Sequence, residues 1–213
     1  LAMVLILVII SLFAAIAGLI YLNNSPVYHV NQGNRLANSE KYMDAVQCYE
    51  KALTKNPENP VDIYMCLMRC YEKLGYEGQY EEYLIRIIES GQKTDEQEIA
   101  AYTRLIRLYE QGNSYQTINS LLNKCNNDKI REQFKEFMVG MPVFSHEEGV
   151  YNKIVPLKLS SPDGHNIFYT LDGTMPNEKS QLYKETIFLE DGVYEFHAIC
   201  IDEHGVKGET VSR

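Results

Sequence analysis

Two arginines recur in matching surroundings and are the side chains best suited to bind a charged ligand. Arg69 and Arg107 stand 38 positions apart, each with a leucine two residues before it and a tyrosine two residues after it. A guanidinium presents a planar fork of N–H donors that fits a carboxylate. We expect the two arginines to lie on corresponding turns of neighbouring helices. There they would bind carboxylates of an acidic peptide or of a chain terminus. The alternative is that each arginine pairs with a nearby carboxylate and stays solvated, the commoner outcome at a protein surface.

Other side chains with reactive potential show no catalytic spacing. A glycosidase needs two carboxylates held across a cleft, but Asp163, Asp172, Glu190 and Asp191 all belong to turn sequences. The five histidines show no HExxH pattern, no GxSxG sequence supplies a nucleophile, and the DxDxDG spacing of a calcium loop is absent. We therefore expect a non-enzymatic protein with no catalytic residue, metal or cofactor.

The five cysteines are irregularly spaced and include no CxxC pair, which argues against a disulfide framework and a zinc ribbon. Cys66 and Cys70 are four residues apart and share one face of a helix, and a metal or redox pair is one interpretation of that spacing. Burial as small hydrophobic side chains is the favoured interpretation, because free cysteine is among the most buried residue types.

The composition narrows the class of partner. Twenty Lys and Arg against 29 Asp and Glu give 213 residues a formal charge of −9, so no basic stripe is available to neutralise nucleic-acid phosphates. The chain is 45% apolar, with 16 tyrosines and no tryptophan, which is too hydrophobic for a disordered chain. We expect folded domains that bind protein and no nucleic acid.

Residues 1–22 contain no charged side chain and predict a transmembrane anchor. As a helix they would extend about 33 Å, against roughly 30 Å of bilayer hydrocarbon. A cleaved signal peptide is the alternative, because Ala15 and Ala17 resemble a cleavage site, although the apolar run is long for one. The first charged residue after the segment is Arg35, and a flank without positive charge favours the outside of the membrane.

Residues 26–139 read as repeated helical pairs. Tyr64, Leu67 and Tyr71 recur 38 residues later as a second Tyr, Leu and Tyr set. The first helical pair has small residues at Gly33, Ala45 and Ala52 and an aromatic residue at Tyr49. A proline, Pro57, follows its second helix. This stretch resembles tetratricopeptide repeats. We place three repeats at residues 26–59, 61–97 and 98–126, with a longer turn at residues 75–78 and a capping helix at residues 128–139.

The resemblance implies that the first helix of each pair lines a concave surface that reads an extended peptide. Small alanines, Ala45 and Ala52, would let the paired helices meet closely, with Tyr49 filling the groove beside them. The implied peptide-binding positions are Asn34, Asn38, Arg69, Glu72, Lys73, Arg107, Glu110 and Gln111.

After Gly140 and Pro142 the pattern changes to short strands separated by Asp-Gly and His-Gly turns. Tyr194, Phe196, Ala198 and Cys200 form an apolar strand face, and Pro156 indicates an edge strand. The sequence Tyr-Thr-Leu-Asp-Gly-Thr-Met-Pro, at residues 169–176, gives residues 141–213 a resemblance to the chitobiase/β-hexosaminidase C-terminal domain. The resemblance implies a small antiparallel β-sandwich.

The expected architecture is therefore multidomain, α then β: a transmembrane helix at 1–22, an α-helical tetratricopeptide-like solenoid at 26–139 and a small antiparallel β-sandwich at 141–213. The expected function is a non-enzymatic protein-binding scaffold, anchored in a bacterial cell membrane by a single span, with its folded domains outside the cytoplasm. The alternative is a carbohydrate or cell-wall polysaccharide binding protein, in which Tyr169 and Tyr183 offer stacking faces.

Overall fold

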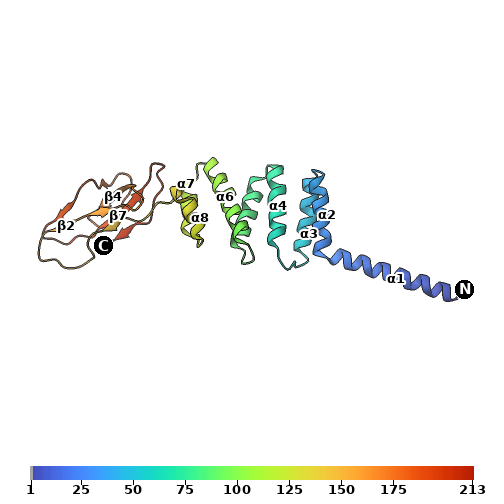
Figure 1. Ribbon diagram of the computed structural model, residues 1–213. Coiled ribbons are helices and arrows are strands. Elements are labelled where there is room, and N and C mark those ends of the chain that lie inside the picture. The colour runs from blue at the N-terminus through green and yellow to red at the C-terminus, as the bar shows by residue number, and fades with distance from the viewer. Residues whose placement is uncertain (1) are drawn as a thin grey trace. The chain divides into compact units, whose positions relative to one another are not determined.

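The computed structural model describes residues 2–213, and there the helices come first and the strands follow, as the sequence predicted (Figure 1). The chain divides into two compact units, one ending at Leu108 and one running Tyr109–Arg213. The helices are α1 (Ala2–Asn24), α2 (Pro26–Asn38), α3 (Tyr42–Leu53), α4 (Val61–Leu74), α5 (Glu77–Glu89), α6 (Asp95–Gln111), α7 (Tyr115–Asn123) and α8 (Asp128–Gln133). The strands are β1 (Val143–Phe144), β2 (Val155–Leu157), β3 (Leu159–Ser160), β4 (Asn166–Thr170), β5 (Gln181–Leu182), β6 (Ile187–Leu189), β7 (His197–Ile201) and β8 (Val211–Ser212).

Helix α1 covers most of the expected anchor, although Leu1 lies outside the described residues. Its side chains from Ile6 to Tyr21 are exposed. Among the described residues no single helix has both the length and the apolar composition of a membrane span, but Ile6–Tyr21 and Pro26–Asn38 together meet both criteria across a bend of 71°. Ser25 caps α2 by accepting a hydrogen bond from the Tyr28 amide at 3.4 Å, and Pro26 is well suited to start a helix. The single span expected over residues 1–22 is thus not found.

The first helical pair, α2 and α3, closes around small residues. Ala45 and Ala52 are fully buried, and Tyr49 is 2% exposed, which confirms their predicted packing. A Cβ atom added to Gly33 would lie 2.6 Å from Cε1 of Tyr49, so only glycine leaves room for this ring. The close approach of the two helices therefore depends on Gly33.

The second pair, α4 and α5, is joined by a tight turn. Gly75 ends α4 in a left-handed conformation, with φ of +71°, which glycine adopts without a steric penalty. Helix α5 already starts at Glu77, so Gly78 is inside the helix and the longer turn expected at residues 75–78 was wrong. Leu67 and Leu84 are fully buried in this unit.

The expected capping helix at residues 128–139 is shorter than predicted. Helix α8 ends at Gln133, and a short 3-10 helix, Lys135–Phe137, follows it. Val139 is instead buried in the β-core of the second unit, where the Asn119 side chain accepts a hydrogen bond from its amide at 3.0 Å. Burial of Val139 in the β-core ends the helical stretch early.

The strands form antiparallel sheets, consistent with the predicted β-sandwich. A four-stranded sheet has the order β5-β4-β7-β8, and two-stranded sheets join β1 to β3 and β2 to β6. In the central β4–β7 ladder Phe168 lies opposite Ile199. Pro156 is exposed in β2, between the buried Val155 and Leu157, as expected for a proline in a strand.

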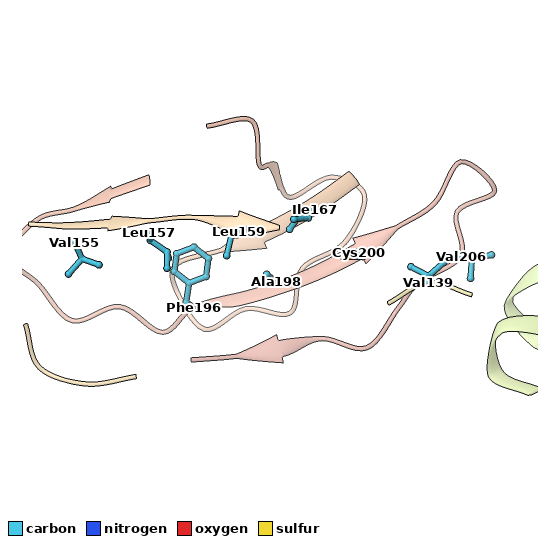
Figure 2. Packing of buried hydrophobic residues seen from close by; sticks show 9 residues of the cluster. All are labelled: Val139, Val155, Leu157, Leu159, Ile167, Phe196, Ala198, Cys200 and Val206. Atoms are coloured by element: carbon cyan, nitrogen blue, oxygen red, sulfur yellow. The ribbon is translucent and has the colours of Figure 1, made fainter. Parts of the chain in front are cut away.

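Figure 2 shows the core of the β-part, which includes Phe196, Ala198 and Cys200 from the predicted apolar strand face. Tyr194 was expected on the same face, but it precedes β7 and is 37% exposed. His197 was expected on the opposite, polar face, but it is only 8% exposed, because both faces of β7 are covered. Strand alternation therefore predicted three of the four core positions.

Helix α7 is hydrogen-bonded to the β-part of the second unit. The buried Asn119 side chain donates to the Lys207 carbonyl at 3.3 Å, in addition to accepting from Val139. Gln116 bonds both backbone groups of Lys207, accepting from its amide at 2.8 Å and donating to its carbonyl at 3.2 Å. These bonds make α7 part of the second compact unit.

Candidate functional site

A cavity of about 410 Å³ opens between α2, α3 and α4, which lie side by side in Figure 1. We call it the helical cavity. Four of the predicted peptide-binding residues line it, namely Asn34, Asn38, Arg69 and Lys73. Its other lining residues are Ala37, Tyr42, Tyr49, Cys66 and Cys70.

Hydrogen bonds hold the polar wall of the helical cavity in place. The Tyr49 hydroxyl donates to Oδ1 of Asn34 at 2.8 Å, and this leaves the two N–H donors of the same amide for other partners. Arg69 donates from Nε to the Met65 carbonyl at 3.2 Å and from Nη2 to the Cys66 sulfur at 3.5 Å. The guanidinium is thus positioned before any ligand arrives.

The helical cavity is electropositive. Among the described residues that line it, only Arg69 and Lys73 carry a formal charge, and both are exposed. They are four residues apart on α4, one helical turn along the same face. An anionic ligand is therefore the complementary one.

Burial keeps the tyrosine and the deeper thiol of the cavity protonated. Burial, followed by the nearby Cys66 thiol, raises the pKa of Tyr49 well above its ordinary value. The same two causes, in the same order, raise the pKa of Cys70 to about 11. Tyr49 therefore remains a hydrogen-bond donor, and Cys70 remains a neutral thiol near pH 7.

The Cys66 and Cys70 pair is not part of a metal cluster. Over the described residues no group of three or more His, Cys, Asp or Glu side chains is arranged to hold a metal ion. Cys70 is buried, as predicted, whereas Cys66 is half-buried and lines the cavity. The pair therefore provides packing on one side and part of the cavity wall on the other.

The other predicted peptide-binding residues do not line the helical cavity. Glu72 forms an ion pair with Arg104 of α6, with Oε1 and Nη1 3.2 Å apart. Arg107 is exposed near the end of the first unit, and Glu110 and Gln111 belong to the second unit. The predicted equivalence of Arg69 and Arg107 thus holds in sequence, while the cavity contains only Arg69.

Sequence reasoning missed part of the cavity wall. Cys66, Arg69, Cys70 and Lys73 follow the spacing i, i+3, i+4 and i+7, which places all four on one face of α4. This spacing was a usable signal that Cys66 and Cys70 accompany the two cations. Tyr42 comes from α3, and its place in the wall depends on how α3 packs.

The two tyrosines considered for sugar stacking lie against the β-core. The Tyr169 ring stacks on Phe196 with centroids 5.3 Å apart, and burial raises the pKa of Tyr169. Tyr183 is half-buried against the same core. One face of the Tyr169 ring is therefore already occupied by Phe196.

Two of the four carboxylates set aside as turn residues, Asp163 and Asp172, accept hydrogen bonds from backbone amides. Asp172 accepts hydrogen bonds from the amide of Thr174 at 3.1 Å and from its hydroxyl at 2.6 Å, and these bonds lower the pKa of Asp172. Asp163 accepts from the Gly140 amide at 2.9 Å. Both side chains fix the backbone of loops.

Comparison with known proteins assigns the β-part to a family. Residues 146–212 match the model of the chitobiase/beta-hexosaminidase C-terminal domain, which confirms the resemblance inferred for residues 141–213. A segment of the chain is 33% identical over 69 residues to the protein-lysine N-methyltransferase SMYD4 of Mus musculus. That segment is 32% of this chain but covers only 9% of the mouse protein. The molecule is thus a helical region followed by a chitobiase/beta-hexosaminidase C-terminal domain.

Proposed function

We propose that this chain is a membrane-anchored, non-enzymatic scaffold whose helical cavity binds an acidic segment of a partner protein. The observation that carries the proposal is the convergence of Arg69 and Lys73 with Asn34 and Asn38 in one cavity. In this proposal α2–α3 and α4–α5 are successive members of a tetratricopeptide-like array. Residues 1–22, which contain no charged side chain, supply the anchor, and residues 23–213 lie outside the cytoplasm.

The spacing of the cations suits an extended peptide. Cβ atoms four residues apart on a helix are about 5–6 Å apart, so Arg69 and Lys73 present two positive groups at roughly that separation. In an extended chain, side chains two residues apart are about 6.6 Å apart and point to the same face. Two acidic residues separated by one other residue would therefore meet both cations.

The two asparagines add recognition of the peptide backbone. Asn34 and Asn38 are one turn apart on α2, and an amide side chain both donates and accepts hydrogen bonds. Extended backbone presents N–H and C=O groups that match such side chains. The ligand is thus bound through its carboxylates by Arg69 and Lys73, and through its backbone by Asn34 and Asn38.

The first prediction is that the double variant Arg69→Ala, Lys73→Ala binds an acidic peptide at least tenfold more weakly than the unaltered chain. Each lost charge-assisted hydrogen bond costs about 1.5–3 kcal/mol. The measurement is fluorescence anisotropy with a labelled Ala-Glu-Ala-Glu-Ala peptide and the full chain in neutral detergent. The matched control is Lys41→Ala, Lys51→Ala, which removes two exposed cations of the first unit outside the cavity. Equal affinity in the cavity variant and the unaltered chain would reject the proposal.

Carbohydrate binding by the β-part is the second candidate. The match of residues 146–212 to a domain named after chitobiase and β-hexosaminidase favours it. In this alternative a sugar ring would use the free faces of Tyr169 and Tyr183, and the helical cavity would have no part in recognition.

A further inference from the structure

A second cavity, of about 440 Å³, lies at one end of the β-part of the second unit, between the loops at residues 146–154 and 190–195. We call it the aromatic cavity, because Phe144, Tyr151, Tyr194 and Phe196 line it. Val155 also lines it. In Figure 2 Val155 lies at one end of the core, and Val139 and Val206 lie at the other end, beside the helical ribbon.

The two loops place their tyrosines in the same way. Each loop contains a Gly-x-Tyr sequence, at Gly149 and Tyr151 and at Gly192 and Tyr194. A Cβ on Gly192 would lie 3.4 Å from the Tyr194 ring, and one on Gly149 would lie 3.8 Å from the Tyr151 ring. Each ring therefore rests over the backbone of its own loop. The Tyr151 hydroxyl also donates to the Glu147 carbonyl at 2.7 Å.

The base of the first loop is fixed to the sheet. Ser145 exchanges two hydrogen bonds with Lys158, one from its amide to the Lys158 carbonyl and one from the Lys158 amide to its hydroxyl, each at 2.9 Å. The His146 ring meets the Tyr151 ring edge to face at 5.8 Å. The tyrosine wall is thus held by contacts within the protein.

The rim of the aromatic cavity is acidic. Four carboxylates, Glu147, Glu148, Glu190 and Asp191, face two cations, Lys153 and Arg213, which leaves a formal charge of −4 + 2 = −2. Arg213 is already engaged, with Nε 3.5 Å from Glu147 and its guanidinium carbon 5.8 Å from the centre of the Phe144 ring. The charge that remains for a ligand is negative.

We propose that the aromatic cavity is a docking site for a lysine- or arginine-containing segment of a partner protein. A cation above tyrosine rings is attracted to their negative faces, and carboxylates at the rim add to that attraction. Val150 and Val193 extend from the two loops with their side chains almost fully exposed, and they offer apolar contact to the chain on either side of the basic residue. A protein segment fits this apolar surround better than a small free amine does.

The experiment is isothermal titration of the full chain, in neutral detergent, with an acetylated and amidated Ala-Lys-Ala-Arg-Ala-Lys-Ala peptide. The comparison ligands are the same peptide with every basic residue replaced by glutamine, free lysine amide, and a chitin oligomer. We expect binding of the basic peptide only, weakened by added salt because rim charges are screened. Binding of the neutral peptide or of the chitin oligomer with equal strength would overturn the proposal. So would binding of free lysine amide alone, or no binding of the basic peptide.

Three variants locate the site. Tyr194→Ala should weaken the basic peptide about fivefold, the size of a partly desolvated cation–π contact, whereas Tyr194→Phe should retain binding. The double variant Glu190→Gln, Asp191→Asn should weaken binding of the basic peptide about as much, and it changes no residue of the core. This variant tests the proposal if Tyr194→Ala fails to fold. The matched control is Glu185→Gln, Glu136→Gln, two exposed carboxylates of the same unit outside the cavity. Unchanged affinity in the rim variant would refute the assignment. The result is independent of the helical cavity, which lies in the other unit and favours the opposite charge.

Discussion

The chemistry of Arg69 depends on the residues one turn before it on α4. The Met65 carbonyl and the Cys66 sulfur both accept hydrogen bonds from its guanidinium. A surface arginine in solvent samples many conformations, and binding must restrict them at a cost. The two hydrogen bonds already restrict the Arg69 side chain before a ligand binds. Arg107 is also exposed, but it does not line the cavity.

We predict that Cys66 is the first cysteine to react with iodoacetamide in the folded chain near pH 8. Cys66 is half-buried in the cavity wall, whereas Cys48, Cys70, Cys125 and Cys200 are at most 9% exposed. The thiolate is the reactive form, and the pKa of Cys70 is raised to about 11 by burial. Peptide mass spectrometry after short alkylation measures the order. Faster labelling of Cys70 than of Cys66 would contradict the described packing.

We also predict that the first unit loses stability as the pH rises above about 8.5. The pKa of Cys70 is about 11 in the folded protein, above the roughly 8.5 of a free cysteine. Likewise burial, followed by the charge of Glu50, raises the pKa of Tyr71 to about 12. Since both folded pKa values are raised, the unfolded chain releases these protons first. The stabilisation is complete below the unfolded pKa values and is lost as the pH rises through 11 and 12.

Urea unfolding followed by the helical circular dichroism signal tests this pH dependence. Cys70→Ala should lower stability at neutral pH but flatten the alkaline loss. Leu67→Ala, at another buried position of α4, should lower stability by about 2–5 kcal/mol and leave the alkaline slope as it was. A slope that is the same in Cys70→Ala and the unaltered chain would show that this thiol does not contribute.

At the scale of elements, the pairing of α2 and α3 depends on a missing side chain. Gly33→Ala would place a methyl group 2.6 Å from the Tyr49 ring, and we predict a net loss of about 1–2 kcal/mol. Overpacking a well-filled contact costs roughly 1–3 kcal/mol, and better helix propensity returns up to about 1 kcal/mol. Urea titration of the Gly33→Ala variant and the unaltered chain measures this difference in the free energy of unfolding.

Gly78→Ala is the matched control for that substitution. Gly78 also lies in a helix, but a Cβ there meets nothing within 4 Å. We expect this variant to be unchanged or to gain about 0.5 kcal/mol. Equal losses in both variants would mean that glycine flexibility, rather than the Tyr49 contact, sets the effect.

The sequence predicted elements where a local pattern decided the outcome. Helical spacing at Ala45, Tyr49 and Ala52 and strand alternation at Phe196 and Ala198 both matched the structure. The sequence-based prediction failed where packing against residues distant in sequence determines the structure. Val139 is an example, because it was expected in a helix but is buried in the β-core. The burial of His197 was missed for the same reason, since alternation assumes that one face of a strand meets solvent.

The candidate site was predictable to a similar extent. Residues on one face of a helix, such as Arg69 and Lys73, follow from spacing alone. The resemblance to tetratricopeptide repeats also supplied Asn34 and Asn38. It could not show that Glu72 is engaged by Arg104, because that contact requires the position of α6. The aromatic cavity was missed because its walls come from separate loops.

At the scale of the whole molecule, the proposed anchor makes a topological prediction. The flank that follows α1 has no charged residue before Arg35, and cytoplasmic flanks usually carry excess lysine and arginine. Protease added to intact cells that produce the chain should therefore degrade residues 23–213. Tagging the C-terminus and blotting before and after treatment measures the loss. Protection until the cells are lysed would place both folded units on the inner side.

The bonds that join α7 to the β-part set a lower limit on what can be transplanted. The family match begins at residue 146, yet the β-core includes Val139, and Lys207 finds its partners in Gln116 and Asn119. A protein fragment that starts at residue 141 would lack the core residue Val139 and would leave Lys207 without its hydrogen-bond partners Gln116 and Asn119. One that starts at residue 109 keeps both. The segment that keeps these contacts together is therefore longer than the segment that matches the family model.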